Sequence, residues 1–354
     1  MVTLGNKQLC SCCFSPIKKE PCKKCGFSEE SYIPDNMVLP CGSILMGNFI
    51  IGKVLGKGGF GITYLAYDVK YDKTIAVKEY FPIELAVRDP ISSKLTVRDK
   101  KSAELFKQGV KKFYGEASFI AEFSGDPNIV RVYQFFYENN TAYFTMEYLT
   151  GMTLKEYVER CGTITAAQAA YIADKVSYAL YDIHKKNVLH RDVSPDNIML
   201  CTDGSVKLLD FGAARQVFPE GSLLLSVILK PGFAPIEQYS RKGKQGEWTD
   251  IYSLAASIYY GLTRQIPEDP QNRLEDDSDM ESNKYNIQPD LWAVLYRSMM
   301  LRYTDRYPTT LELINALSLV PIKRQTIKIP HKLPPPAAEE ADSPLKKLLA
   351  KLFG

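Results

Sequence analysis

The hydrophobic pattern divides the chain into two regions of different character. From Phe49 to Thr74, apolar and polar residues alternate around glycines. Strand-like runs follow at Thr74–Glu79, Ile129–Tyr137 and Thr141–Tyr148. A period of two predicts strands, and the turn at Glu138-Asn139-Asn140 predicts that the last two runs form a hairpin. The first region is therefore expected to be rich in β-structure.

Helical spacing dominates the second region. One long helix is also predicted within the β-rich region, where apolar residues recur every three or four positions, at Phe106, Val110, Phe113, Ala117 and Ile120. After Gly151, segments with an apolar stripe predict helices at Leu154–Cys161, Ala166–Lys186, Trp248–Leu262 and Leu291–Leu301. A β-rich lobe that precedes a helical lobe defines an α+β fold with two lobes.

The amino-terminal segment carries metal-ligand spacing. Cys10 and Cys13 form one Cys-x2-Cys pair, and Cys22 and Cys25 form a second pair eight residues later. This pattern predicts a tetrahedral zinc ribbon with four thiolate ligands, which folds only with its metal. A disulfide cluster is the alternative, and Cys12 leaves the ligand set open because it could replace a neighbour.

Composition narrows the class of protein. The 354 residues are 45% hydrophobic and 24% charged with a net charge of +3, which suffices for a large core and gives no reason to expect nucleic-acid binding. The first ten residues do not resemble a secretory signal, and no window offers the roughly 20 apolar residues that span a bilayer. We expect a cytoplasmic protein with reduced thiols.

These patterns give an expected organisation. A zinc ribbon-like module covers 1–33, a connector 34–48, and the two-lobed domain 49–320, divided into 49–149 and 150–320. A Pro-rich linker then covers 321–342, and a cationic amphipathic helix covers 343–354. The ribbon is expected to bind a partner or to steady its neighbour. The final helix could dock on a partner or on the preceding domain, or lie peripherally on an anionic membrane surface.

Three features of the first lobe suggest phosphate chemistry. The segment Gly56-Lys57-Gly58-Gly59-Phe60-Gly61 lies between two predicted strands, where a backbone without large side chains can bend over a phosphate chain. Lys78 lies in the next strand, within reach of such phosphates. Glu116 shares a helix face with Phe113 and Ile120, so it is the expected ion-pair partner of Lys78.

The second lobe supplies the segment His190–Asn197, and Asp210-Phe211-Gly212 begins thirteen residues after Asn197. Together with the glycine segment, Lys78 and Glu116, these motifs resemble the eukaryotic-type protein kinase superfamily in order and spacing, over roughly Phe49 to Val320. The residues Lys78-Glu79-Tyr80-Phe81-Pro82 and Ser194-Pro195-Asp196-Asn197 resemble a bacterial serine/threonine kinase subgroup.

Three further residues extend the resemblance. Pro235-Ile236-Glu237 stands where the family has Ala-Pro-Glu, and Arg306 resembles the arginine that pairs with this glutamate. Asp250 resembles the helix aspartate that holds the backbone of the catalytic loop. The resemblance implies the two-lobed protein kinase fold.

The resemblance also implies transfer of the ATP γ-phosphoryl group to serine or threonine hydroxyls of protein substrates. Asp192 would accept the hydroxyl proton, while Asn197 and Asp210 would hold Mg²⁺ or Mn²⁺. Lys78, fixed by Glu116, would position the α and β phosphates. The other residues implied at the ATP site are Leu55, Gly56, Lys57, Gly58, Gly59, Phe60, Gly61, Thr63, Ala76, Met146, Glu147 and Leu149.

The sequence departs from the family beside the catalytic aspartate. Ser194 occupies the position of a lysine, and Lys230 occupies the position of the substrate-docking threonine. We hypothesise that Lys230 supplies the missing ammonium, with a solvated loop lysine as the alternative. A pseudokinase or scaffold that binds partners through the ribbon is the competing function.

Arg191, which precedes the catalytic aspartate, suggests regulation because such an arginine can pair with a phosphorylated activation loop. Ser222 and Ser226 are the available acceptors, and Ser226 is preferred. Autophosphorylation there would switch the enzyme on, and constitutive activity is the alternative.

Overall fold

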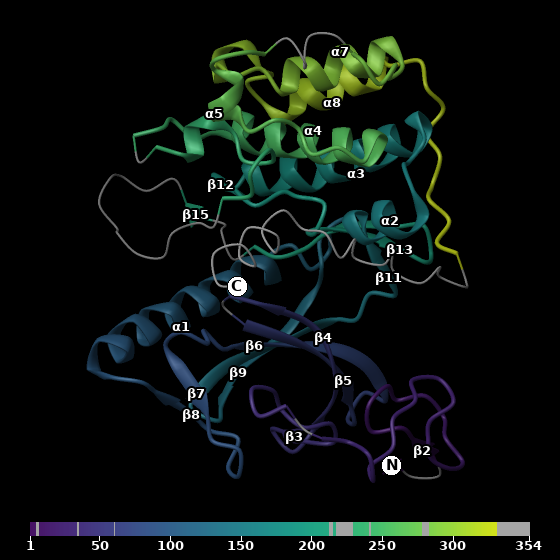
Figure 1. Ribbon diagram of the computed structural model, residues 1–354, viewed down its shortest axis with the longest axis vertical. Helices are drawn as coiled ribbons and strands as arrows, with labels where there is room; N and C mark the ends of the chain where they lie inside the picture. The colour runs from purple at the N-terminus through teal and green to yellow at the C-terminus, as the bar shows by residue number, and fades with distance from the viewer. Residues whose placement is uncertain are drawn as a thin grey trace, which may run out of the picture. The chain divides into compact units, whose positions relative to one another are not determined.

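The computed structural model describes residues 1–4, 7–33, 35–59, 61–211, 215–216, 229–240, 242–277 and 283–330. These fall into two compact units, Met1–Thr150 and Gly151–Gly354 (Figure 1). Phe60, Ser222, Ser226, part of the predicted linker and the predicted helix at 343–354 lie outside the described residues. None of the described helices is long and apolar enough to cross a membrane.

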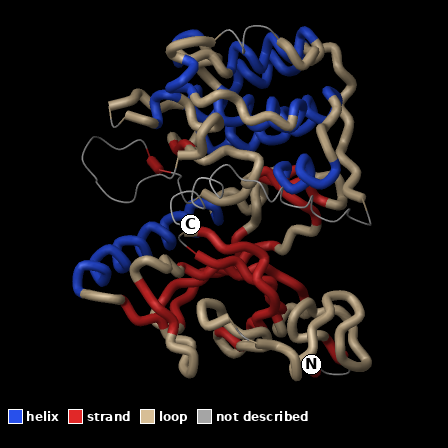
Figure 2. The backbone as a smooth tube through the Cα atoms, viewed as in Figure 1, coloured by secondary structure: helices blue, strands red, loops and turns tan. Residues whose placement is uncertain are grey.

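The first unit is built on a six-stranded sheet with antiparallel pairing, and Figure 2 draws its strands in red. Its strands follow the spatial order β3 (Ile44–Leu45), β4 (Phe49–Gly58), β5 (Gly61–Asp68), β6 (Lys73–Tyr80), β10 (Thr141–Glu147) and β9 (Val132–Glu138). The predicted hairpin of the last two strands is present, and β9 begins three residues later than its apolar run. The β-rich first lobe is thus confirmed.

The strand pairing assigns residues to the two faces of this sheet. Thr63 lies opposite Lys78, and Ala76 lies opposite Met146. Because Ala76 and Lys78 are two residues apart in β6, all four residues share one face. The neighbouring residue Glu79 must then belong to the opposite face.

The long helix α1 (Lys100–Ala121) is capped by Asp99, whose carboxylate accepts a hydrogen bond from the Ser102 N–H at 2.7 Å. Its apolar stripe packs on the sheet through Phe113, whose ring lies 5.7 Å from that of Tyr80 and 4.9 Å from that of Phe144. Gly109 allows this approach, since a β-carbon there would lie 1.7 Å from the Tyr80 hydroxyl oxygen.

A short hairpin not expected from the sequence separates β6 from α1. It consists of β7 (Ala86–Arg88) and β8 (Leu95–Val97). The hairpin explains the wide spacing of 38 residues between Lys78 and Glu116. It also delivers the Arg88 guanidinium to the buried carboxylate of Glu79, with 2.6 Å between Nη2 and Oε2.

The amino-terminal module packs against the sheet. It begins with a small hairpin, β1 (Val2–Leu4) and β2 (Lys7–Leu9). Leu9 and Phe14 form a buried apolar cluster with sheet residues, namely Ile50, Leu65 and Tyr67. In addition, the Lys53 N–H in β4 donates to the Cys12 carbonyl at 2.8 Å. The module is therefore joined to the strand that leads into the glycine segment.

The regular secondary structure of the second unit is mainly helical, as the blue segments in Figure 2 show. Its helices are α2 (Leu154–Cys161), α3 (Ala166–His184), α4 (Glu247–Thr263), α5 (Pro270–Arg273), α7 (Pro289–Ser298) and α8 (Thr310–Leu319), with 3-10 turns at Ile236–Gln238 and Tyr303–Asp305. Its short strands are β11 (Gly151–Thr153), β12 (Val188–Leu189), β13 (Ile198–Cys201), β14 (Val206–Leu208) and β15 (Arg215–Gln216).

The core of this unit lies where α3 packs against α4 and α8. Thr165 caps α3 through a reciprocal capping box with Gln168, and α4 is buried along nearly its whole length. The strand β13 lies between β11 and β14 in a three-stranded sheet. The segment 190–197 therefore connects two fixed strands, β12 and β13.

The contact between module and sheet gives a first prediction. A β-carbon at Gly52 would lie 2.5 Å from the Cys12 carbonyl oxygen and 2.8 Å from the Phe14 ring. Gly52→Ala should therefore lower the free energy of unfolding by about 1–3 kcal/mol through overpacking. Urea denaturation followed by fluorescence measures this. Gly125→Ala is the matched control, because its β-carbon meets no atom within 4 Å. Equal stability of the two variants would contradict the packing described.

Candidate functional site

In the first unit, Lys78 and Glu116 form an ion pair, with 3.0 Å between Nζ and Oε1. Their side chains are 16% and 8% exposed, so water screens the pair only weakly. The Lys78 ammonium also lies 5.7 Å from the centre of the Phe144 ring. The packing of α1 on the sheet thus fixes the position of one cation on the face that carries Thr63 and Met146.

The glycine segment forms the tip of the β4–β5 hairpin, where Gly56 pairs with Thr63 and Gly58 with Gly61. A β-carbon at Gly61 would lie 2.3 Å from the Glu79 carbonyl oxygen, so this position requires glycine. Leu55 is 39% exposed. The Glu147 N–H donates to the Arg131 carbonyl at 2.9 Å, so this N–H already has a partner within the protein.

In the second unit, Asn197 holds the carboxylate of Asp192. Its side-chain N–H donates to the Asp192 main-chain oxygen at 2.8 Å and to Oδ2 at 2.9 Å. The Leu209 N–H donates to the Asn197 carbonyl at 2.8 Å, which brings the chain that carries Asp210 beside Asn197. An amide oxygen and a carboxylate are hard donors that suit Mg²⁺, so these two residues fit a magnesium site.

The buried carboxylate of Asp250 holds the backbone of this segment. Its Oδ2 accepts from the His190 N–H at 2.8 Å, and its Oδ1 accepts from the Arg191 N–H at 2.7 Å. His190 is fully buried, and burial lowers the pKa of its imidazole. Its Nε2 donates to the Leu209 carbonyl at 3.1 Å and its Nδ1 accepts from the Asp192 N–H at 3.3 Å, so both ring nitrogens have backbone partners.

A second histidine supports Asp250 from behind. His184 Nε2 lies 2.7 Å from Asp250 Oδ2, and Nδ1 lies 2.6 Å from the Thr310 hydroxyl and 3.4 Å from a Glu247 carboxylate oxygen. Burial disfavours the charged ring, but the hydrogen bonds to Asp250 and Glu247 outweigh it and raise the pKa of His184 to about 9. The pair is therefore ionic at neutral pH.

The segment after Lys230 is fixed by another buried ion pair. Arg306 forms two hydrogen bonds with Glu237, of 2.7 Å from Nη1 to Oε1 and 3.1 Å from Nη2 to Oε2. The Thr249 hydroxyl also donates to Glu237 at 3.0 Å. Both charged side chains are almost fully buried, so the pairing anchors residues 235–238 to the start of α4.

Lys230 lies beside the catalytic segment. Its Nζ is 2.7 Å from the Ser194 hydroxyl oxygen and 3.1 Å from Asp192 Oδ1. The structure thus brings together the two residues whose types differ from the family pattern.

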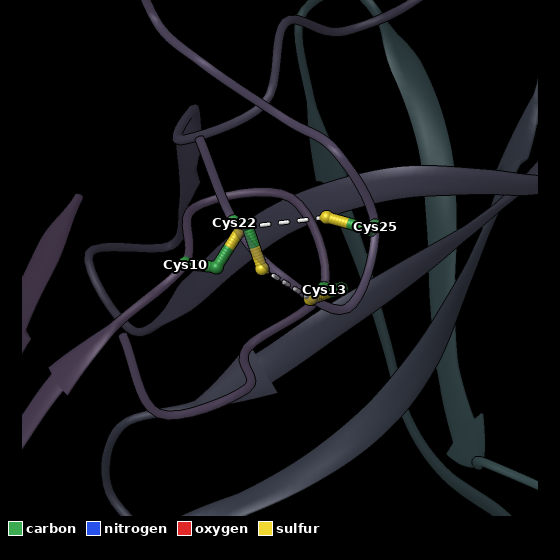
Figure 3. A group of neighbouring side chains, drawn as sticks. All are labelled: Cys10, Cys13, Cys22 and Cys25. Atoms are coloured by element: carbon green, nitrogen blue, oxygen red, sulfur yellow. Dashed lines mark hydrogen bonds between the residues drawn. The ribbon is translucent and has the colours of Figure 1, made fainter. Parts of the chain in front are cut away.

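The four cysteines of the two Cys-x2-Cys pairs converge at the amino terminus (Figure 3). Their sulfur atoms all lie within 4.8 Å of one another, with 3.7 Å for both Cys10–Cys25 and Cys13–Cys22. Zinc–sulfur bonds of about 2.3 Å in a tetrahedron require about 3.8 Å between sulfurs, so the geometry fits zinc. Cys12 is outside this group, so the geometry favours Cys10, Cys13, Cys22 and Cys25 as the ligands.

Sequence reasoning did not find the roles of His184 and Glu79. Glu79 is fully buried and accepts hydrogen bonds from Arg88, Tyr64 and Tyr143 at 2.5–2.8 Å. One signal was present in the sequence. Two adjacent charged residues in the middle of a strand must point to opposite faces, so Glu79 needed a partner of its own.

Comparison with known proteins agrees with this geometry. The family model for the protein kinase domain matches residues 49–352, so the chain belongs to the protein kinase domain family.

Bacterial serine/threonine-protein kinases are among the relatives. PknA of Nostoc is 28% identical over 288 residues, which cover 78% of this chain and 48% of PknA. Kinase D of Synechocystis is 30% identical over 285 residues, which cover 77% of this chain and 52% of that protein. The chain therefore spans about half the length of these relatives. The solved apo form of PpkA-294 superposes with a TM-score of 0.70 and 33% identity, over 79% of this chain and 99% of that one.

The cysteine cluster gives a prediction for metal content. Protein purified without chelator should contain one zinc ion per chain by elemental analysis, because four thiolates converge in tetrahedral range. Cys22→Ser should lose this zinc. Cys12→Ser is the matched control and should retain it. Absence of zinc from the native protein, or equal loss in both variants, would contradict the site.

His184 predicts a pH dependence of stability. Its folded pKa of about 9 lies above the ordinary value of about 6.5, so its contribution is complete below pH ~6.5 and is lost as the pH rises through about 9. At about 1.4 kcal/mol per pKa unit, the loss should be of the order of 3 kcal/mol. Urea denaturation between pH 6 and 10 measures it against His184→Gln. The difference between the two proteins should shrink across this window, and a constant difference would refute the assignment.

Proposed function

We propose that this protein is a serine/threonine protein kinase that transfers the γ-phosphoryl group of ATP to hydroxyls of protein substrates. The proposal depends mainly on the position of the Asp192 carboxylate. Asn197 donates a hydrogen bond to it, and Asp250 holds the preceding backbone by accepting from the Arg191 N–H. The bacterial kinases that resemble this chain support the same reaction class.

Each residue has a role in this reaction. Asp192 accepts the proton of the acceptor hydroxyl as its oxygen attacks the γ-phosphorus. Asn197 and Asp210 hold Mg²⁺ or Mn²⁺, which neutralises charge on the phosphate oxygens. Lys78 positions the α and β phosphates, and Glu116 fixes the ammonium of Lys78.

The ATP contacts follow the sheet of the first unit. The glycine segment covers the phosphates, and the face shared by Thr63, Ala76 and Met146 receives the adenine, with backbone contacts near Leu149. The kinase domain covers residues 49–320 in this proposal. Its β-rich lobe covers 49–149 and its helical lobe covers 150–320, as the strand and helix patterns indicate.

Regulation and partners complete the proposal. Arg191 pairs with a phosphate placed on Ser226 or Ser222 by autophosphorylation. The ribbon at 1–33, through the connector 34–48, steadies the sheet and offers its exposed side to a partner. The segment 343–354 contacts a partner or a membrane surface. The competing function is a scaffold without catalysis, although Lys78, Asp192 and Asp210 are all present.

A phosphotransfer assay tests the proposal. Purified protein with radiolabelled ATP and Mg²⁺ should label itself or a generic acceptor such as casein. Asp210→Asn should lower the rate by at least about 100-fold, because it removes a metal ligand. Asp203→Asn is the matched control and should retain activity, since this carboxylate accepts from the Ser205 N–H and hydroxyl in the turn between β13 and β14. No transfer by the native protein would favour the scaffold.

Mapping of phosphosites in the same reaction tests the regulation. Mass spectrometry should find phosphate on Ser226 or Ser222 in active protein. Active protein with both serines unmodified would contradict the proposed switch and leave the phosphotransfer activity intact.

A further inference from the structure

The environment of Lys230 contains more than a surface ion pair. Its ammonium lies 2.7 Å from the Ser194 hydroxyl oxygen and 3.1 Å from Asp192 Oδ1. A lysine ammonium only donates, so both oxygens accept. The Ser194 side chain is fully buried, and its hydroxyl gives the ammonium a fixed partner that a solvated loop lysine would lack.

The backbone around Lys230 is also fixed. The Lys230 carbonyl accepts hydrogen bonds from the N–H groups of Phe233 and Ala234, both at 3.0 Å. Gly232 adopts a φ of +79°, and a β-carbon there would lie 2.4 Å from the Pro267 carbonyl oxygen. This turn therefore sets where the lysine side chain starts.

A second anchor joins this region to the catalytic segment. The Gln238 side-chain N–H donates to the Arg191 carbonyl at 3.0 Å. The turn after Lys230 and the backbone next to Asp192 are thus held in one frame, and the ammonium does not depend on its own flexible stem alone.

The Asp192 carboxylate is held on both of its oxygens. Asn197 donates to Oδ2 at 2.9 Å, and Lys230 contacts Oδ1. An ammonium has three N–H donors, of which two are directed at Ser194 and Asp192. Among the residues that the structure describes, the other acid within ion-pair range is Asp196, which lies at 4.0 Å and thus beyond hydrogen-bonding distance. The third donor can therefore turn to a phosphoryl oxygen.

We propose that Lys230 is a catalytic residue. Protein kinases of this type carry a lysine two residues after the catalytic aspartate, at the position of Ser194, and here Lys230 supplies that cation from the activation segment. Ser194 is its docking partner. This inference rests on the proposed function.

Atoms and charge balance in this step. The acceptor oxygen forms a bond to the γ-phosphorus, the bond from phosphorus to the ADP oxygen breaks, and the hydroxyl proton passes to Asp192. Lys230 stabilises negative charge on the transferred phosphoryl group and exchanges no proton.

Exchange of the two residue types tests the inference. Lys230→Thr should lower kcat by about 100-fold and change the KM for ATP little, because the contact forms mainly in the transition state. Ser194→Lys combined with Lys230→Thr returns the ammonium to the other position and should recover at least a tenth of native kcat. Lys155→Thr is the matched control, since Lys155 pairs with Asp196 of the same segment at 3.2 Å and should retain native kcat.

A binding measurement separates this inference from the proposed function. ADP with Mg²⁺ and aluminium fluoride mimics the transferred phosphoryl group, and calorimetry measures its dissociation constant without turnover. Lys230→Thr should weaken this binding by about 100-fold and leave ADP binding unchanged, with recovery in the double variant.

Three results would overturn the role of Lys230. They are native kcat in Lys230→Thr, equal affinity of the native and Lys230→Thr proteins for the analogue, or a folded double variant without recovery. A native protein that binds the analogue through Lys230 but transfers no phosphate would instead refute the proposed function alone.

Discussion

The position of the catalytic segment depends on the carboxylate of Asp250, which is shielded from solvent. Asp250 is fully buried, and a buried charge costs several kcal/mol unless donors surround it. Its donors are the N–H groups of His190 and Arg191 and the imidazole of His184. Arg191 has a φ of +64°, a conformation that is unfavourable for a side chain of this kind. The charge-assisted hydrogen bonds offset that strain, and they decide where the next residue, Asp192, points.

The same principle governs the first unit. Lys78 and Glu79 are adjacent in a central strand, so their side chains leave on opposite faces. Lys78 meets Glu116 from α1, while Glu79 meets Arg88 from the β7–β8 hairpin. The strand is thus held by ion pairs on both sides. Removal of either partner would leave the other charge without its ion-pair partner in a poorly solvated place.

Local patterns in the sequence predicted the two lobes and the principal helices, because these depend on periodicity and on neighbours within a few positions. The roles of the residues in the catalytic segment came instead from the resemblance to the protein kinase family. The β7–β8 hairpin was missed because its strands have three residues each, too few to show a period. The partnerships of Glu79 with Arg88 and of His184 with Asp250 were also missed, since they join residues whose proximity only the fold creates.

The amino-terminal module shows the same limit. The cysteine spacing predicted four converging sulfurs, but it could not exclude Cys12 as a ligand. In the structure the sulfurs that lie within 4.8 Å of one another belong to Cys10, Cys13, Cys22 and Cys25, and Cys12 is not among them. The spacing also gave no sign of the cluster of Leu9 and Phe14 with the sheet. The packing of this module on the sheet depends on the shapes of the two surfaces and on the small size of Gly52, and the spacing of cysteines carries no information about either.

Ser194 and Lys230 show why a family motif is better understood as an arrangement in space. A lysine at position 194 would place a second ammonium close to that of Lys230, whose Nζ lies 2.7 Å from the Ser194 hydroxyl. Two like charges about 4 Å apart repel by about 4 kcal/mol at an effective dielectric constant of 20. This repulsion favours one cation at the site, supplied from either position, over two. A small hydroxyl at 194 is what a lysine at 230 requires, and the charge beside Asp192 is kept although its place in the sequence has changed.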